Sequence, residues 1–196
     1  MARNIIAALS DSTVFLREWL VNPQRTGAVA PSSPQLGAAM ARWLPRNPES
    51  YVLELGPGTG AVTDALLKYG LREDRLLAIE KNPTLAKILR KRFLQAQIIT
   101  GDAWDLDKLV AELPRPIESV GAVISSLPLL NFPKEEADSL ARKIRAILEP
   151  RGRWVQYSYQ IVKDRSRGGD DFKLLASKVV WFNLPPARVS VYQNPG

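Results

Sequence analysis

The chain has 196 residues, of which 45 % are hydrophobic and 24 % charged, and its net charge is +7. This length and composition predict one soluble globular domain with a full core, not a disordered or membrane-spanning chain. Because the chain has no cysteine and no histidine, disulfides, thiolate metal sites and histidine general bases are excluded, and we expect no bound metal. The positive charge favours an anionic partner, either nucleic acid or a membrane surface.

Residues 3–21 carry apolar side chains at helical spacing and polar ones opposite, which predicts an amphipathic helix. Such a helix either packs on the domain or lies in a membrane interface, where Trp19 and Arg25 would meet lipid. The apolar run is too short for a signal peptide, and the expected location is the cytoplasm.

Ser33 and Pro34 form an N-cap and first-turn pair that begins a second helix, predicted to end near Leu44. Both helices belong to a predicted N-terminal extension over residues 1–45. The main domain is then expected over residues 46–196.

Residues 51–60 read as a buried strand that runs into a glycine-rich turn, and a helix is predicted over 61–69. Gly56, Gly58 and Gly60 lack the Cβ atoms that would hinder a tight turn or the close approach of a ligand. A turn between the first strand and the first helix of a doubly wound sheet is a place where nucleotide-like cofactors bind.

Two further strands end in acidic residues. A strand over 75–80 ends in Glu80, about twenty residues after the glycine turn, and a strand over 96–100 leads to Asp102. Each acid has a plainer interpretation, since Glu80 could pair with Lys81 and Asp102 could cap the short helix that follows. Because parallel strands bring their carboxyl ends to one edge, we expect both acids beside one ligand.

The remaining elements alternate between helix and strand until the end of the chain. Helices are predicted over 83–93, 105–112 and 134–148, and strands over 120–125, 153–160, 178–182 and 188–192. This alternation predicts an α/β fold with a parallel sheet and right-handed crossovers. The last two strands predict a closing hairpin.

The series of strands, glycine turn and acids resembles the class I, Rossmann-like S-adenosylmethionine-dependent methyltransferases. Their first motif has the form E-x-G-x-G-x-G, which Glu54 begins here, whereas an NAD loop would read G-x-G-x-x-G. The resemblance implies a seven-stranded, mostly parallel sheet with a C-terminal antiparallel hairpin and an N-terminal helical extension. It implies that Glu80 binds the ribose hydroxyls, that Asp102 faces the adenine amino group, and that the glycine turn holds the methionine end. The implied cofactor-binding residues are Ser33, Glu54, Gly56, Gly58, Gly60, Glu80, Lys81, Asp102, Ala103 and Ser125.

The loop after the fourth strand argues against methylation of an adenine amino group. Enzymes of that kind carry an Asn or Asp and, after a proline, an aromatic residue that stacks on the base. Here Ser126 and Leu129 stand at these two positions. The chain is also too short for the extra helical domain of the ribosomal RNA adenine dimethylases, which its first half resembles, so a nucleic-acid partner is not expected.

Segments along nearly the whole chain resemble the bacterial phospholipid N-methyltransferases. The matching segments are 15–23, 27–34, 126–130, 155–159 and 183–187. The resemblance implies successive methylation of the amine of phosphatidylethanolamine toward phosphatidylcholine, by a peripheral protein on the anionic inner face of the cell membrane. The family often has a basic residue where this chain has Phe182.

Alternation along the fifth strand predicts that Tyr157 and Tyr159 share a face near its ligand end. The proton of the acceptor amine could pass to either tyrosine, to water or to a carboxylate. The catalytic candidates are Tyr159, Tyr157, Ser126 and Leu127, and the substrate-binding candidates are Trp19, Arg25, Arg165, Arg167 and Arg188. Two other functions stay open, an RNA base methyltransferase and a non-catalytic lipid- or cofactor-binding protein, and the oligomeric state is not predicted.

Overall fold

A computed structural model describes residues 32–113, 116–117, 120–159 and 171–196. The predicted helix over 3–21 lies outside these residues, as do Trp19, Arg25, Arg165 and Arg167. Ser32–Gly196 forms one compact unit. Since this unit includes the helix α3 (Pro34–Ala41), that helix is part of the domain, while the boundary near residue 45 stays a prediction.

Seven strands form one sheet, in the order β3-β2-β1-β4-β5-β7-β6. The strands are β1 (Tyr51–Leu55), β2 (Leu76–Glu80), β3 (Gln97–Thr100), β4 (Val120–Ser125), β5 (Leu148–Ser158), β6 (Lys173–Val180) and β7 (Ala187–Gln193). The first five pair in parallel, and β7 pairs antiparallel with both β5 and β6. The predicted fold of the class I methyltransferases, with its antiparallel C-terminal hairpin, is confirmed.

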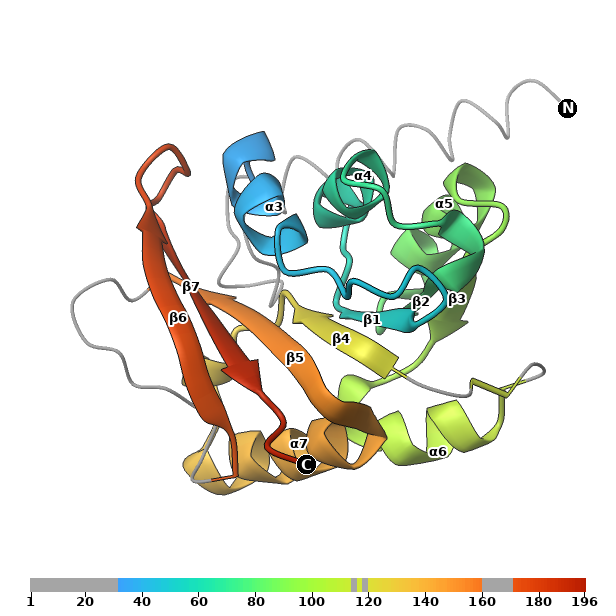
Figure 1. The fold of residues 1–196 in the computed structure, drawn as a ribbon. Coiled ribbons are helices and arrows are strands. Elements are labelled where there is room, and N and C mark those ends of the chain that lie inside the picture. Colours follow the sequence, from blue (N-terminus) through green and yellow to red (C-terminus); the bar gives the residue numbers. More distant parts are fainter. Residues whose placement is uncertain (1–31, 114–115, 118–119, 160–170) are drawn as a thin grey trace, which may run out of the picture. The chain divides into compact units, whose positions relative to one another are not determined.

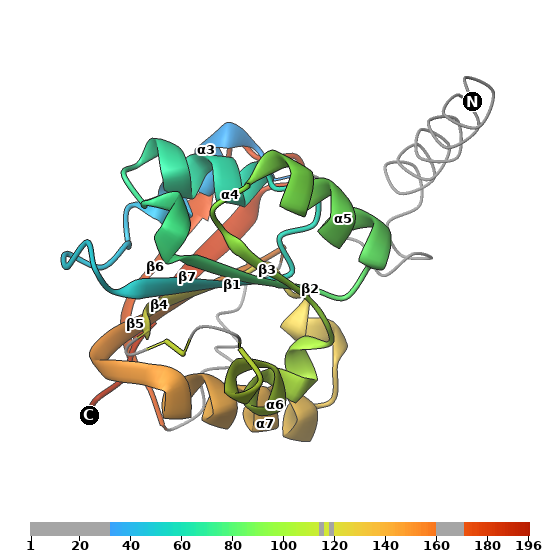
Figure 2. The same cartoon turned by 90° about the vertical axis from the view of Figure 1, so that its right-hand side faces the viewer.

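Helices cover both faces of the sheet. One layer contains α3, α4 (Ala61–Lys68) and α5 (Pro83–Arg92), and the other contains α6 (Leu106–Ala111) and α7 (Lys134–Ile147) (Figures 1 and 2). Three short 3-10 turns complete the described elements, at Glu73–Arg75, Ala103–Asp105 and Leu129–Asn131. Among the described residues, no helix is long and apolar enough to cross a membrane.

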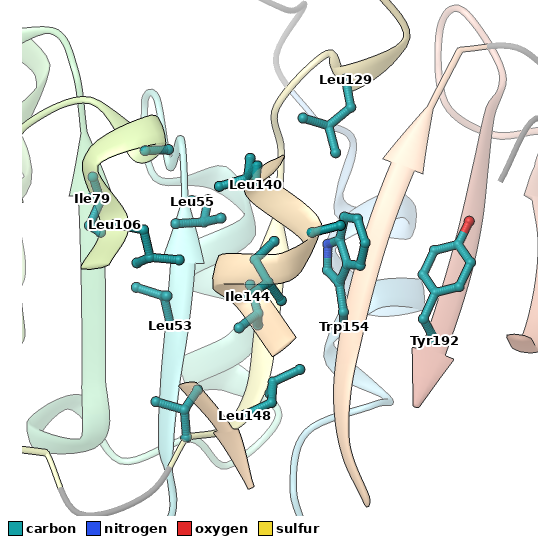
Figure 3. Close-up of a cluster of buried hydrophobic side chains, with 14 of the residues drawn as sticks. Leu53, Leu55, Ile79, Leu106, Leu129, Leu140, Ile144, Leu148, Trp154 and Tyr192 are labelled. Atoms are coloured by element: carbon teal, nitrogen blue, oxygen red, sulfur yellow. The ribbon is translucent and has the colours of Figure 1, made fainter. Parts of the chain in front are cut away.

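The main core lies between the sheet and the layer of α6 and α7. Leu53 of β1 and Ile144 of α7 are fully buried there, and the ring of Trp154 from β5 packs beside Tyr192 of β7 (Figure 3). Apolar residues recur on α7 at helical spacing, which is why one side of this helix is buried. This core fixes the strands whose carboxyl ends carry the site.

Two boundaries differ most from the sequence-based prediction, and α3 also ends at Ala41 and not near Leu44. The turn predicted after α7 is a bulge within β5, since pairing with β4 already begins at Leu148 and Arg151 adopts a φ of 64°. The strand predicted over 178–182 begins at Lys173 and ends at Val180, so that Trp181 and Phe182 belong to the turn before β7. The strand propensity of single residues does not predict these boundaries, because they depend on where the hydrogen bonds to the neighbouring strand begin and stop.

Candidate active site

The glycine turn joins β1 to α4 at the carboxyl edge of the sheet. Gly56, Gly58 and Gly60 have φ angles of 68°, 58° and 85°, a region that residues with a Cβ rarely adopt. A Cβ at Gly56 would lie 2.9 Å from a methyl carbon of Leu127, and one at Gly60 would lie 3.0 Å from the ring of Phe93. At Gly58 no described atom lies within 4 Å of that position, so the turn leaves open space there.

Glu80 lies across this turn and is almost buried. Its Oε2 accepts a hydrogen bond from the Gly58 amide at 2.9 Å, and its Oε1 accepts one from the Asn82 amide at 2.8 Å. Asn82 in turn caps α5 by accepting hydrogen bonds from the amides of Thr84 and Leu85. The Glu80 carboxylate is therefore held in place at the end of β2.

Lys81 pairs with Asp102 rather than with Glu80. Its Nζ lies 2.7 Å from the Asp102 carboxylate, which also accepts a hydrogen bond from the Trp104 amide. Burial acts to raise the pKa of Asp102, but the hydrogen bonds from Lys81 and Trp104 outweigh it and hold that pKa below its ordinary value. Asp102 thus caps the 3-10 turn that begins at Ala103 and not the following helix α6, whose N-cap is Asp105, and it stays charged at the carboxyl edge.

Glu54 of β1 is fully buried behind the glycine turn. Its Oε2 accepts a hydrogen bond from the Thr63 hydroxyl of α4 at 2.7 Å, and its Oε1 has no hydrogen-bond partner among the described residues. Burial raises the pKa of this carboxyl to about 7, because a charge there loses its hydration. An orphaned buried oxygen next to a ligand-binding turn suits a donor group on the ligand.

The loop after β4 packs against the glycine turn. The Ser126 amide donates to the Leu55 carbonyl at 2.9 Å, and the Ser125 hydroxyl, which is buried, accepts a hydrogen bond from the Leu127 amide at 3.4 Å. The Ser126 hydroxyl is buried and has no partner among the described residues. Gln156 of β5 donates to the Leu127 carbonyl at 2.8 Å and so ties this loop to the next strand.

Tyr157 and Tyr159 lie against each other, as alternation along the strand predicts. Their ring centroids are 5.6 Å apart, and their hydroxyls are hydrogen-bonded to each other. The Tyr157 hydroxyl is also bonded to the Ser32 side chain, and that of Tyr159 to Asn183. Burial raises the pKa of both phenols, which keeps both hydroxyls neutral near neutral pH.

Asn183 joins this tyrosine pair to the beginning of α3. Its Oδ1 accepts a hydrogen bond from the Ser33 amide at 2.9 Å, and its Nδ2 donates to the Pro185 carbonyl at 2.7 Å. The Ser33 hydroxyl caps α3 by accepting from the Leu36 amide. Asn183 is only 2 % exposed although it belongs to a hairpin turn, so hydrogen bonds of its buried side chain hold the turn in place.

Arg188 lies apart from the tyrosine pair. It is paired with Ser158 across β5 and β7, and alternation along β5 puts Ser158 on the opposite sheet face from Tyr157. Its guanidinium donates to the Ser177 hydroxyl at 2.9 Å. Among the substrate-binding candidates, Arg188 is the one that the structure describes.

A family model described as a methyltransferase domain matches residues 52–152, just over half of the chain. The chain belongs to the class I S-adenosylmethionine-dependent methyltransferases. It is 32 % identical over 151 residues to the ornithine lipid N-methyltransferase of Singulisphaera acidiphila, which covers 76 % of this chain and 78 % of that relative. Within the class, it therefore belongs to the family of bacterial lipid N-methyltransferases.

Other similar proteins share less with this methyltransferase. A probable ribosomal RNA small subunit methyltransferase A of Thermococcus onnurineus is 47 % identical, but the match covers 35 % of this chain and 26 % of that relative. Among solved structures, TrmN from Thermus thermophilus has a TM-score of 0.66 at 18 % identity, with 82 % of this chain and 48 % of that chain covered. The N-methyltransferase NodS from Bradyrhizobium japonicum has a TM-score of 0.59 at 14 % identity, with 83 % of this chain and 93 % of that one covered. At these identities the structures support the fold.

The methyl donor of this methyltransferase is S-adenosylmethionine, and the described residues fit it. Gly58 leaves open space beside a backbone turn, Glu80 presents a carboxylate at the end of β2, and Glu54 keeps one buried oxygen unpartnered among the described residues. S-adenosylmethionine supplies a methyl group bonded to a positively charged sulfonium sulfur, and this sulfur leaves readily as a neutral thioether when a nucleophile takes the methyl group.

Three residues that position this site carried no assigned role in the sequence. Thr63 holds Glu54, Gln156 holds the loop after β4, and Asn183 joins Tyr159 to Ser33. Gln156 lies between the apolar residues Trp154, Val155 and Tyr157, and a polar side chain in such a stretch is a signal in the sequence for a buried hydrogen bond. Thr63 and Asn183 look ordinary in a helix and a turn, so their roles depend on the tertiary contacts.

Proposed function

We propose that this methyltransferase transfers methyl groups from S-adenosylmethionine to the amine of phosphatidylethanolamine at a membrane surface, in successive steps toward phosphatidylcholine. The observation that carries this proposal is the similarity to a lipid N-methyltransferase over 76 % of the chain. The ribosomal RNA relatives match less than half of it, as in the 35 % covered by the Thermococcus onnurineus protein.

On the cofactor side, Glu80 is expected to accept hydrogen bonds from the ribose hydroxyls, in exchange for its bond to the Gly58 amide. Asp102 is expected beside the adenine amino group, with Ala103 and Lys81 next to it. Glu54 is expected to accept, through its unpartnered Oε1, from the methionine end.

On the acceptor side, we expect the amine beside the hydroxyl of Tyr159, with Ser126 and Leu127 lining the approach. The raised pKa of both tyrosines disfavours a phenolate, so the hydroxyls orient the amine and do not take its proton. The proton leaves to water, and the neutral amine forms its C–N bond as the C–S bond breaks. Holding nucleophile and methyl group in line and near contact can supply much of the rate without a histidine.

The test is incubation of the whole protein with methyl-labelled S-adenosylmethionine and three separate acceptors. These are vesicles of phosphatidylethanolamine, vesicles with ornithine lipid, and ribosomal RNA. We expect label in mono-, di- and trimethylated phosphatidylethanolamine after lipid chromatography. Label in ornithine lipid alone would replace the proposed acceptor, and label in RNA alone would overturn the lipid assignment. Cofactor binding without any labelled product would favour a non-catalytic protein.

A further inference from the structure

The turn between β6 and β7 exposes three large apolar side chains within four residues. Trp181, Phe182 and Leu184 are 67 %, 84 % and 89 % exposed, whereas Asn183 between them is buried. We call these three side chains the apolar tip. Soluble proteins seldom gather large exposed apolar side chains on one protruding turn without a binding partner.

The apolar tip lies at the carboxyl edge of the sheet, where the site is. Val180 pairs with Ala187 and Ser158 pairs with Arg188, so the turn follows directly beyond the carboxyl end of β5. Figure 1 shows this turn next to α3. Asn183, which belongs to this turn, is hydrogen-bonded to Ser33 and to Tyr159. The apolar tip is therefore connected directly to the tyrosine pair.

The charge around the apolar tip has one sign. The charged side chains on the strand ends that flank the turn are Lys178 of β6 and Arg188 of β7, and neither strand contains an Asp or Glu. Lys178 is exposed on the strand that enters the turn. Tryptophan and phenylalanine suit the boundary between headgroups and acyl chains, and nearby cations suit anionic lipid.

A protein partner is a poorer fit to this surface. An aromatic side chain buries about 150–250 Å² at most, whereas a standard protein interface buries about 800 Å² on each partner. Three side chains on one narrow turn fall short of that area. The small apolar tip, with basic residues beside it, is suited to insertion into a lipid surface.

We propose that the apolar tip inserts into the interfacial region of an anionic phospholipid bilayer. This inference depends on the proposed lipid acceptor, because insertion brings Tyr159 to the level of the headgroups. A lipid amine can then reach the site while its acyl chains stay in the bilayer. Because the apolar tip lies at the carboxyl edge, its insertion would place the acceptor side of the site at the membrane surface.

The absence of cysteine makes a direct test possible. Phe182→Cys is labelled in the whole protein with a polarity-sensitive fluorophore and mixed with vesicles of phosphatidylethanolamine and phosphatidylglycerol. The matched control is Leu94→Cys, an 81 % exposed residue in the connection from α5 to β3, at the opposite edge of the sheet. We expect a blue shift and quenching by spin-labelled lipid at position 182, and neither at position 94.

A second variant tests the energetic contribution. Trp181, Phe182 and Leu184 are changed to serine together, with Leu94→Ser as control. We expect the triple variant to bind the vesicles about tenfold or more weakly, since each apolar side chain contributes to partition. Its affinity for S-adenosylhomocysteine and its thermal unfolding should match those of the parent.

Each outcome decides the proposal. A label at position 182 that stays in water while the protein binds vesicles overturns it, as does a parent that does not bind vesicles. A blue shift that needs protein concentration but no vesicles would assign the apolar tip to a second copy of the chain, which also overturns it. The proposed function is judged separately: methylation of detergent-dispersed phosphatidylethanolamine can persist if the tip fails, and lipid insertion of the tip can persist if no lipid is methylated.

Discussion

The cofactor side of the carboxyl edge is built from neighbouring pieces of chain, whereas the acceptor side is assembled from distant ones. Glu80 reaches the Gly58 amide across 22 positions, and Thr63 reaches Glu54 across nine. Asn183 reaches Ser33 across 150 positions. A local unit of strand, turn and helix can keep its ligand geometry in many proteins, while the acceptor side depends on how the last hairpin meets α3. The two sides should therefore respond independently to substitution.

The largest effect on ligand affinity is expected from Gly58→Val on the cofactor side. A β-branched residue is strained at a φ of 58°, and its side chain would fill the open space beside the turn. We expect affinity for S-adenosylhomocysteine to fall about a hundredfold or more by calorimetry, which is roughly 2.7 kcal/mol. Gly70→Val is the matched control, because Gly70 also has a positive φ and open space but follows α4 at its far end. Equal loss in both variants would mean that strain, not the ligand space, causes the effect.

Glu54→Gln should change how stability depends on pH. The pKa of Glu54 is about 7 in the folded protein and 4.5 as the ordinary value, so the folded state binds a proton more tightly between these limits. Stability should therefore fall as pH rises through that window, with the full cost, up to about 3 kcal/mol, present above pH 7. Urea unfolding at pH 5 and pH 8 should show a smaller fall in Glu54→Gln. Glu112→Gln, at the exposed C-cap of α6, is the matched control, and an unchanged slope in Glu54→Gln would contradict the assignment.

Tyr159→Phe tests the acceptor side. The substitution removes only the hydroxyl that contacts Tyr157 and Asn183, so packing should survive. We expect lipid methylation to fall about tenfold or more, roughly 1.4 kcal/mol in the activation free energy, with unchanged affinity for S-adenosylhomocysteine. Tyr69→Phe, at the exposed C-cap of α4, should match the parent. Loss of cofactor affinity in Tyr159→Phe would show that the two sides are not independent.

The smallest effect is expected from Trp19→Glu, in the amphipathic helix predicted from the sequence. If this helix lies in the membrane interface, sedimentation with anionic vesicles should weaken about fivefold, roughly 1 kcal/mol, while cofactor affinity stays the same. Leu94→Glu adds the same charge at an exposed site elsewhere. A variant that sediments like the parent would mean that the helix is a packing element.

Patterns in the sequence predicted the structure best where the contacts are local. The spacing from the glycine turn to Glu80 predicted that both lie at the carboxyl edge, because parallel strands bring such residues together whatever the rest of the chain does. It also predicted that Tyr157 and Tyr159 share a face, because side chains alternate along a strand. It left open the partner of Lys81, which proved to be Asp102.

Periods of two and 3.6 residues predicted the class of fold, and the resemblance of the motifs to a known family implied the cofactor. The residues assigned to cofactor binding stay a prediction. The contacts of Asn183 with Ser33 and of Gln156 with the loop after β4 are visible only in the folded protein, as is the place of Trp181 on an exposed turn and not in a strand. Hydrogen bonds between residues far apart in the chain depend on how the elements pack, and a local pattern does not record that packing.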